Sequence, residues 1–200
     1  MNYPSRETAE GLLRWAVSLN LGPWEKHSET AARAAETIAA KCGMDAERAY
    51  VLGLLHDIGR FEGVRGLHHV IAGYQLMQEK GYDGAARICL NHSFPVQDSA
   101  CFNGKRDCTP EETAFIDREL QAMEYDDYDR LIQLCDALAT EERITLIEPR
   151  LLDVAIRHGV GSFYQEKWKG FLDCKAYFDE KCGCNIYQLF REEIEKNIFG

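Results

Sequence analysis

A histidine and an aspartate stand side by side in the segment LLHDIGRF (residues 54–61), directly after an almost wholly apolar stretch that runs from Ala49 to Leu55. A helix that is apolar on nearly every side is expected to be buried. An ionised carboxylate is costly to bury without a partner, so Asp57 should be paired with a cation. The cation could be an arginine, or it could be a metal ion that His56 also binds, and adjacency alone does not distinguish the two.

Other segments place metal-binding residue types elsewhere in the chain. His27 precedes the Ala-rich segment SETAARAAETIAAKCG, His92 ends the apolar segment ARICLNHS, and Asp136 lies among apolar residues in RLIQLCDALAT. Each has an ordinary explanation, because a lone histidine is more often a surface or packing residue than a ligand, and a buried aspartate can pair with an arginine. Together they place histidines and aspartates on separate apolar helices, which is what a metal site inside a helical bundle requires.

Helices are the elements predicted to position these residues. Apolar residues recur at helical spacing over residues 6–19. The next helix is expected to begin with Ser28 as its N-cap, which leaves His27 just before it. The apolar helix that carries the His-Asp pair is expected to begin with Asp45 as its N-cap and to end at Gly59.

The second half of the chain gives similar signals. Residues 67–81 and the segment from Asp83 predict further helices, and residues 94–109 predict a polar loop. The helix that contains Asp136 follows, and the C-terminal tail predicts two or three more helices. No sustained apolar–polar alternation predicts a strand. The fold class is therefore all-α, a single compact helical bundle over residues 1–200.

Composition and charge restrict the class of protein. A chain of 200 residues, 46% of them hydrophobic, can bury a substantial core. The formal net charge of −10 argues against a nucleic-acid polymer as partner, because phosphate backbones bind clustered Lys and Arg; small phosphorylated molecules stay open. The N-terminus is not a signal peptide, and no apolar stretch is long enough to span a bilayer. We therefore expect a cytoplasmic protein without a membrane partner.

The eight cysteines are then expected to be reduced thiols, because the cytosol does not sustain structural disulfides. The close pair in KCGCN (residues 181–185) has no complementary pair elsewhere and indicates a metal site only weakly.

The motifs together resemble the HD superfamily of metal-dependent phosphohydrolases. His27 matches the first histidine of the family's motif, HD at residues 56–57 matches the central pair, and Asp136 matches the distal aspartate. HDIG followed by a basic residue, here Arg60, is a form common in the family.

Two further segments extend the resemblance. HHVIAG is similar to the family's segment in which a histidine is followed four residues later by a glycine, which favours His69 over His68 as a ligand, and NHS places His92 as the next one. The resemblance covers roughly residues 10–160 and implies a bundle of the HD-domain type. Residues 161–200 would then form a C-terminal helical cap over it.

The resemblance also implies a metal site and a reaction. The implied ligands are four histidines and two aspartates: His27, His56, Asp57, His69, His92 and Asp136. Imidazole with carboxylate suits divalent iron, manganese, zinc or nickel better than calcium or magnesium, and one or two ions would be held. A metal-bound hydroxide would attack the phosphorus of a phosphomonoester or phosphodiester, and we expect the substrate to be a nucleotide. Asp57 and Arg60 are the expected catalytic residues, with the arginine stabilising phosphate charge without giving up its proton.

Two other functions use comparable residues. An inositol oxygenase holds two irons with a similar set of four histidines and two aspartates and activates oxygen. A non-catalytic nucleotide-sensing module would keep the fold without turning over a substrate, although degenerate members usually lose ligands and none is missing here. No residue specifies an oligomeric state or a particular nucleotide.

Overall fold

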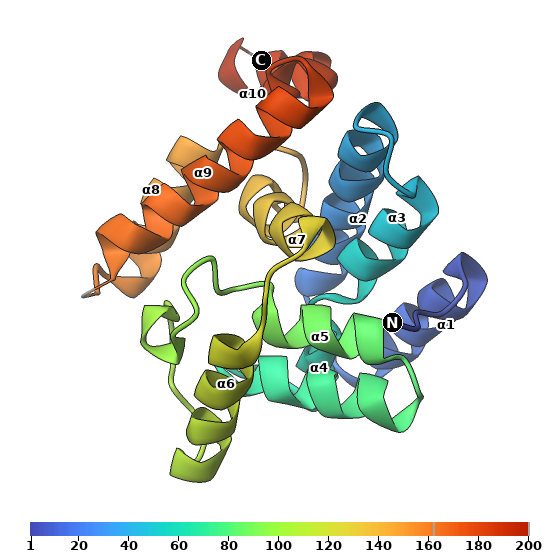
Figure 1. Cartoon of the computed structure of the whole chain (residues 1–200), viewed down its shortest axis with the longest axis vertical. Coiled ribbons are helices and arrows are strands. Elements are labelled where there is room, and N and C mark those ends of the chain that lie inside the picture. The colour runs from blue at the N-terminus through green and yellow to red at the C-terminus, as the bar shows by residue number, and fades with distance from the viewer. Residues whose placement is uncertain (162, 200) are drawn as a thin grey trace.

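The computed structural model describes residues 1–161 and 163–199 of the chain (Figure 1). Within these residues, α-helices and short 3-10 helices (η) follow one another in the order α1 (Arg6–Leu19), α2 (Trp24–Lys41), α3 (Ala46–Leu55), η1 (Ile58–Glu62), α4 (His68–Glu79), α5 (Asp83–Asn91), η2 (Ser99–Cys101), α6 (Pro110–Ala122), α7 (Asp127–Leu138), α8 (Ile147–His158), α9 (Tyr164–Cys182), η3 (Ile186–Phe190) and α10 (Arg191–Phe199). The β pairing found among the described residues is an isolated bridge between Ala139 and Ile144. The all-α prediction is confirmed. None of the helices described is long and apolar enough to cross a membrane.

Helix α7 lies in the middle of the fold. Figure 1 shows it between the α2–α3 pair and α9, and both pack against it. Leu131, Leu134 and Leu138 are fully buried on it, and their spacing of three and four residues forms an apolar stripe. The stripe belongs to a large apolar cluster that also includes residues of α1, α2, α3 and α9. Asp136 is thereby carried on the helix that most of the molecule packs around.

The start of α2 differs from the prediction. Ser28 is not an N-cap, because the helix begins at Trp24 and Ser28 is fully buried inside it. Pro23 occupies the N-cap position, and its fixed φ is already suited to a helix. His27 therefore lies in the first turn of α2, where the helix itself orients its side chain.

Helix α3 begins as predicted and ends earlier than predicted. Asp45 caps it, but the helix ends at Leu55, and Gly59 lies in the 3-10 helix that follows. The reason is the close approach of η1 to α4: a Cβ atom on Gly59 would lie 1.9 Å from the carbonyl oxygen of His69 and 2.4 Å from the backbone nitrogen of Gly73. The chain leaves the α-helix to make this crossing.

A buried polar network holds α5 against α7. The carboxylate of Asp129 is 1% exposed and accepts hydrogen bonds from Arg87 Nε at 2.9 Å, from Asn91 Nδ2 at 2.6 Å and from the backbone N–H of Asp126 at 2.8 Å. Because His92 directly follows α5, this network fixes the position of that histidine relative to α7.

The loop predicted for residues 94–109 is confirmed and contains only the short helix η2 among its described elements. Helix α6 follows it and packs on α4 and α5 through a second, smaller apolar cluster that includes Leu67, Leu90, Ile116 and Leu120. Helices α9 and α10 fall in the predicted cap of residues 161–200, and α9 packs on α7 and α2. The assignment of the whole chain to one domain stays a prediction.

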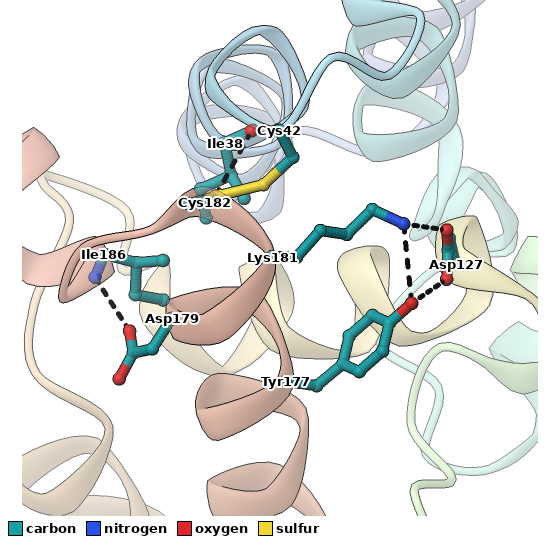
Figure 2. The surroundings of a disulfide bond; sticks show 8 residues. All are labelled: Ile38, Cys42, Asp127, Tyr177, Asp179, Lys181, Cys182 and Ile186. Carbon is teal, nitrogen blue, oxygen red and sulfur yellow. Dashed lines mark hydrogen bonds and ion pairs between the residues drawn. A yellow bond between two sulfur atoms is a disulfide. The ribbon is translucent and has the colours of Figure 1, made fainter.

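A disulfide bond joins Cys42, just after α2, to Cys182, the last residue of α9 (Figure 2). The prediction that all eight cysteines are reduced thiols is therefore wrong for this pair. The two cysteines are 140 positions apart and meet because α9 packs across α2. Beside the bond, the hydroxyl of Tyr177 donates to Asp127 of α7 at 2.6 Å, and Lys181 pairs with the same carboxylate.

Candidate metal centre

Side chains from α2, the end of α3 and α7 meet in a first group, which we call the α2–α7 group (His27, His56 and Asp136). The Nε2 atom of His27 lies 2.9 Å from Asp136 Oδ1 and 3.3 Å from His56 Nε2. His56 Nε2 is 3.8 Å from the same carboxylate oxygen. The His56 side chain is fully buried, whereas that of Asp136 is 23% exposed, so this group opens to solvent at α7.

A second group adjoins the first, and we call it the α4–α5 group (Asp57, His69 and His92). Asp57 Oδ1 lies 3.1 Å from His69 Nε2 and 3.5 Å from His92 Nε2, and the two Nε2 atoms are 3.3 Å apart. All three side chains are buried. His56 connects the groups, because its Nε2 is 3.9 Å from Asp57 Oδ2 and its ring centroid is 4.9 Å from that of His92.

The buried imidazoles are oriented by the backbone. Each of His56, His69 and His92 places its Nδ1 atom 2.5–3.0 Å from the carbonyl oxygen three residues earlier in the chain. A carbonyl only accepts, so Nδ1 carries the proton and donates it, and Nε2 of the neutral ring presents a lone pair to the centre. Histidines that bind metals in proteins are held by this kind of hydrogen bond on the opposite ring nitrogen.

The two oxygens of Asp57 have different surroundings. Oδ2 accepts a hydrogen bond from Arg60 Nε at 2.5 Å. Oδ1 is buried and has no hydrogen-bond donor within the described residues. Burial is the largest influence and favours the neutral acid, but Arg60 together with His69 and His92 outweighs it and holds the pKa of Asp57 well below its usual range, so the carboxylate is ionised. Asp57 therefore has the arginine partner that the sequence left open. Arg60 binds its Oδ2 atom, and its Oδ1 atom faces the imidazoles.

Such a centre suits a divalent transition ion. Burial lowers the pKa of His56 to about 4, so this imidazole is neutral at physiological pH and its lone pair is available. Lone pairs of nitrogen and carboxylate oxygen face one another within 3.5 Å, an arrangement that a shared cation stabilises. The ligand atoms lie within 4.8 Å of one another in three sets: His27, His56 and Asp57; His56, His92 and Asp136; Asp57, His69 and His92. These overlapping sets, which share His56, Asp57 and His92, could hold a metal ion.

Comparison with known proteins places the chain in a family. A family model described as HD domain matches residues 24–141, more than half of the chain and a range that contains every residue of both groups. The chain belongs to the HD-domain family. The crystal structure of the HD domain of the phosphodiesterase PgpH from L. monocytogenes is similar to this HD domain, with 16% sequence identity over 94% of this chain and 96% of that chain and a TM-score of 0.44. No curated protein matches the sequence.

The centre of this HD domain brings together all the residues predicted as ligands. Of the two adjacent histidines, His69 faces Asp57 and His92, whereas His68 lies in a different cluster. Arg60, predicted to contact phosphate, contacts Asp57. Its role toward a substrate stays a prediction, as does metal binding by each ligand.

Two residues near the centre were not identified from the sequence. The ring of Phe102, in the loop before α6, has its centroid 5.9 Å from that of His69. Lys167 of α9 is 8% exposed and donates to the carbonyl oxygen of Cys101 at 3.1 Å. Burial lowers the pKa of this lysine to about 8, against the opposing charge of Asp136. Neither residue stands in a motif, and a lysine in an amphipathic helix usually predicts a solvated side chain.

Proposed function

We propose that this HD domain is a metal-dependent phosphohydrolase with a dinuclear centre. The observation that carries the proposal is that the α2–α7 group and the α4–α5 group adjoin at Asp57, whose Oδ1 lies 3.1 Å from His69 Nε2 and whose Oδ2 lies 3.9 Å from His56 Nε2. The α2–α7 group would hold one ion, His69 and His92 would hold the other, and Asp57 would bridge them. Family membership supports the assignment.

The donor set favours divalent iron, manganese, zinc or nickel. Such ions supply Lewis-acid polarisation of phosphoryl oxygens and a water molecule of lowered pKa. The apolar helices around the centre keep bulk water away from the α4–α5 group, whose carboxylate is only 4% exposed. Substrate would approach at Asp136 and Arg60, whose side chains are 23% and 32% exposed.

Arg60 would contribute charge and orientation. Its Nε–H is bonded to Asp57, which leaves further N–H donors of the guanidinium to contact a phosphoryl oxygen. Because a guanidinium keeps its proton, this residue would stabilise negative charge on the phosphoryl group and would not protonate the leaving group.

The substrate we propose is a small phosphorylated molecule, specifically a nucleotide, and not a nucleic-acid polymer. The net charge of −10 disfavours a long polyanion. Phe102 offers an aromatic ring beside His69, and bases stack on such rings. The same residue lines a hollow of about 120 Å³ with Tyr164, which is smaller than the roughly 300–1,000 Å³ of sites that enclose a whole ligand. The hollow would therefore accommodate only part of a nucleotide.

The test combines metal analysis with hydrolysis assays. Protein stripped of metal would be reloaded with iron, manganese, zinc or nickel and assayed on p-nitrophenyl phosphate, bis(p-nitrophenyl) phosphate and nucleoside monophosphates. We expect two ions bound to the centre of each chain, and phosphate release that depends on them. Asp57→Asn should lower activity by more than the roughly 10- to 100-fold that results from changing a residue behind a metal ligand. Asp173→Asn, at an exposed carboxylate on α9, should change neither the number of bound ions nor the hydrolytic activity.

Other outcomes would assign a different function or refute the proposal. Full hydrolysis in Asp57→Asn would show that the centre is not the site of reaction. Oxygen consumption by the iron-loaded protein without phosphate release would indicate an oxygenase of the inositol-oxygenase type. Tight nucleotide binding without turnover, with metal bound, would indicate a sensing module.

A further inference from the structure

A second cluster of metal-binding residue types lies outside the HD centre, where the loop before α6 meets the start of α4. His68 Nδ1 is 3.5 Å from Glu112 Oε1. One ligand atom each from His68, Cys108 and Glu112 lies within 4.8 Å of the others. The His68 and Glu112 side chains are 19% and 27% exposed, so the cluster is reachable from solvent but largely covered.

Hydrogen bonding fixes the direction of the His68 lone pair. Its Nε2 atom lies 3.0 Å from Glu62 Oε2 in η1. A carboxylate only accepts, so Nε2 donates the proton, and Nδ1 of the neutral ring turns its lone pair toward Glu112 Oε1, which is also an acceptor. A cation between these atoms would satisfy both. A carboxylate behind an imidazole is also the usual support for a metal-binding histidine.

The residues of the cluster are held in place by contacts that do not need an ion. Glu112 Oε2 accepts from the backbone N–H of Thr109 at 2.8 Å, and Thr109 Oγ1 accepts from the N–H of Glu112 at 3.1 Å, which is a capping box at the start of α6. This leaves Glu112 Oε1 directed at His68. Asp107 in turn accepts from the backbone N–H groups of Gly66 and His68, both at 2.9 Å, and fixes the loop to the start of α4.

We propose that His68, Cys108 and Glu112 form a separate mononuclear site for a divalent transition ion, with Glu62 orienting the imidazole. Thiolate, imidazole and carboxylate are the ligands of protein zinc sites, and a water molecule would take the fourth position on the exposed side. Burial raises the pKa of the Cys108 thiol to about 11, so metal binding displaces its proton to solvent.

An ion at this site would connect three elements that meet beside the HD centre. Glu62 belongs to η1, His68 to α4, and Cys108 with Glu112 to the loop and the first turn of α6. The same loop carries Phe102, which packs against His69. The ion would therefore fix one wall of the HD centre, and its binding does not depend on what reaction that centre performs.

Cobalt(II) titration of the metal-free chain of 200 residues tests the proposal. Thiolate-to-cobalt charge transfer absorbs in the near ultraviolet, and the HD centre has no sulfur among its ligands, so the band distinguishes this site from the HD centre. We expect a band that saturates at one thiolate-bound cobalt per chain. Cys108→Ser should abolish it, whereas Cys184→Ser, at another partly buried cysteine outside the disulfide, should leave it unchanged.

Two glutamate variants separate a metal ligand from a packing residue. Glu112→Gln keeps the capping box, because glutamine serves at that position as well, but removes the anionic ligand. We expect unchanged helicity by circular dichroism and at least tenfold weaker cobalt binding. Glu62→Gln should weaken binding by about 10- to 100-fold through the imidazole.

The proposal fails if the wild-type protein shows no near-ultraviolet band, if the band survives Cys108→Ser, or if Glu112→Gln binds cobalt as tightly as the wild type. If Cys108→Ser does not fold, cobalt titration of Glu112→Gln and Glu62→Gln tests the proposal instead. Loss of phosphatase activity plays no part in these outcomes, so they are independent of the proposed function.

Discussion

Gly59 is the position at which a single methyl group should damage both the fold and the metal centre. In Gly59→Ala, the new Cβ would lie 1.9 Å from the carbonyl oxygen of His69 and 2.4 Å from the nitrogen of Gly73. Both obstacles are backbone atoms of α4, so no side-chain rotation relieves the clash. Either η1 or α4 must shift by about 1 Å, since packed interiors leave no room to absorb an added group.

The size of the effect follows from this geometry. Overpacking a core typically costs about 1–3 kcal/mol, and a backbone obstacle should place this variant at about 3 kcal/mol. For a chain of this length, each kcal/mol changes the melting temperature by about 2–4 °C, so we expect a decrease of about 6–12 °C. The shift also separates η1 from the His69 turn, which lengthens the 3.1 Å contact between Asp57 Oδ1 and His69 Nε2. Metal affinity should then fall by about 10- to 100-fold, as it does when the support of a ligand is lost.

Thermal denaturation by circular dichroism and metal titration of the same protein would measure both effects. Gly11→Ala on α1 is the matched control, because its Cβ would meet only the side chain of Arg14, at 3.9 Å. Alanine is the better helix former, so the control should be up to about 1 kcal/mol more stable than the wild type, with unchanged metal binding. If Gly59→Ala melted and bound metal like the wild type, the close approach of η1 to α4 would not exist in solution.

Three further predictions concern stability. Asp129→Ala leaves Arg87 without its buried partner and should lower the free energy of unfolding by about 3–5 kcal/mol in urea titrations; an unchanged midpoint would contradict the network between α5 and α7. Cys42→Ser removes a cross-link across 140 residues and should lower the free energy of unfolding by about 2–5 kcal/mol. A reductant should destabilise the wild type by the same amount and leave the variant unaffected. Burial lowers the pKa of Lys167 to about 8 from 10.5, so between these pH values the unfolded chain binds a proton that the folded chain does not. Lys167→Met should therefore be more stable than the wild type at pH 7, and this advantage should shrink as pH rises from 8 to 10.5; an advantage independent of pH would refute the cause given.

The helices could be predicted where their signals are local. The apolar spacing of residues 6–19 and the cap at Asp45 involve residues within one turn of each other, and both predictions are confirmed. The predicted start of α2 was wrong. Serine is a favoured N-cap residue, but Ser28 lies inside the helix with its side chain buried, so its preference for the N-cap position is not realised. Pro23, five residues earlier, is the competing local signal.

Contacts between distant segments could not be predicted from spacing. The disulfide between Cys42 and Cys182 depends on how α9 crosses α2, and no motif predicts that these two cysteines pair. Asp129 shows its local role through the capping box it forms with Asp126, but its pairing with Arg87 appears only when α5 and α7 are packed together.

The adjacent histidines show how far a motif can specify a site. Successive residues of an α-helix point about 100° apart, so His68 and His69 cannot face the same centre. Residues four apart share a face, and Gly73 therefore lies on the side of α4 that His69 occupies. That side must be flat enough for η1 to approach, and a glycine there is what permits the contact with Gly59. The face of α4 that contacts η1 is therefore also the face that brings His69 to Asp57, and the same geometry turns His68 toward Glu62 and the start of α6.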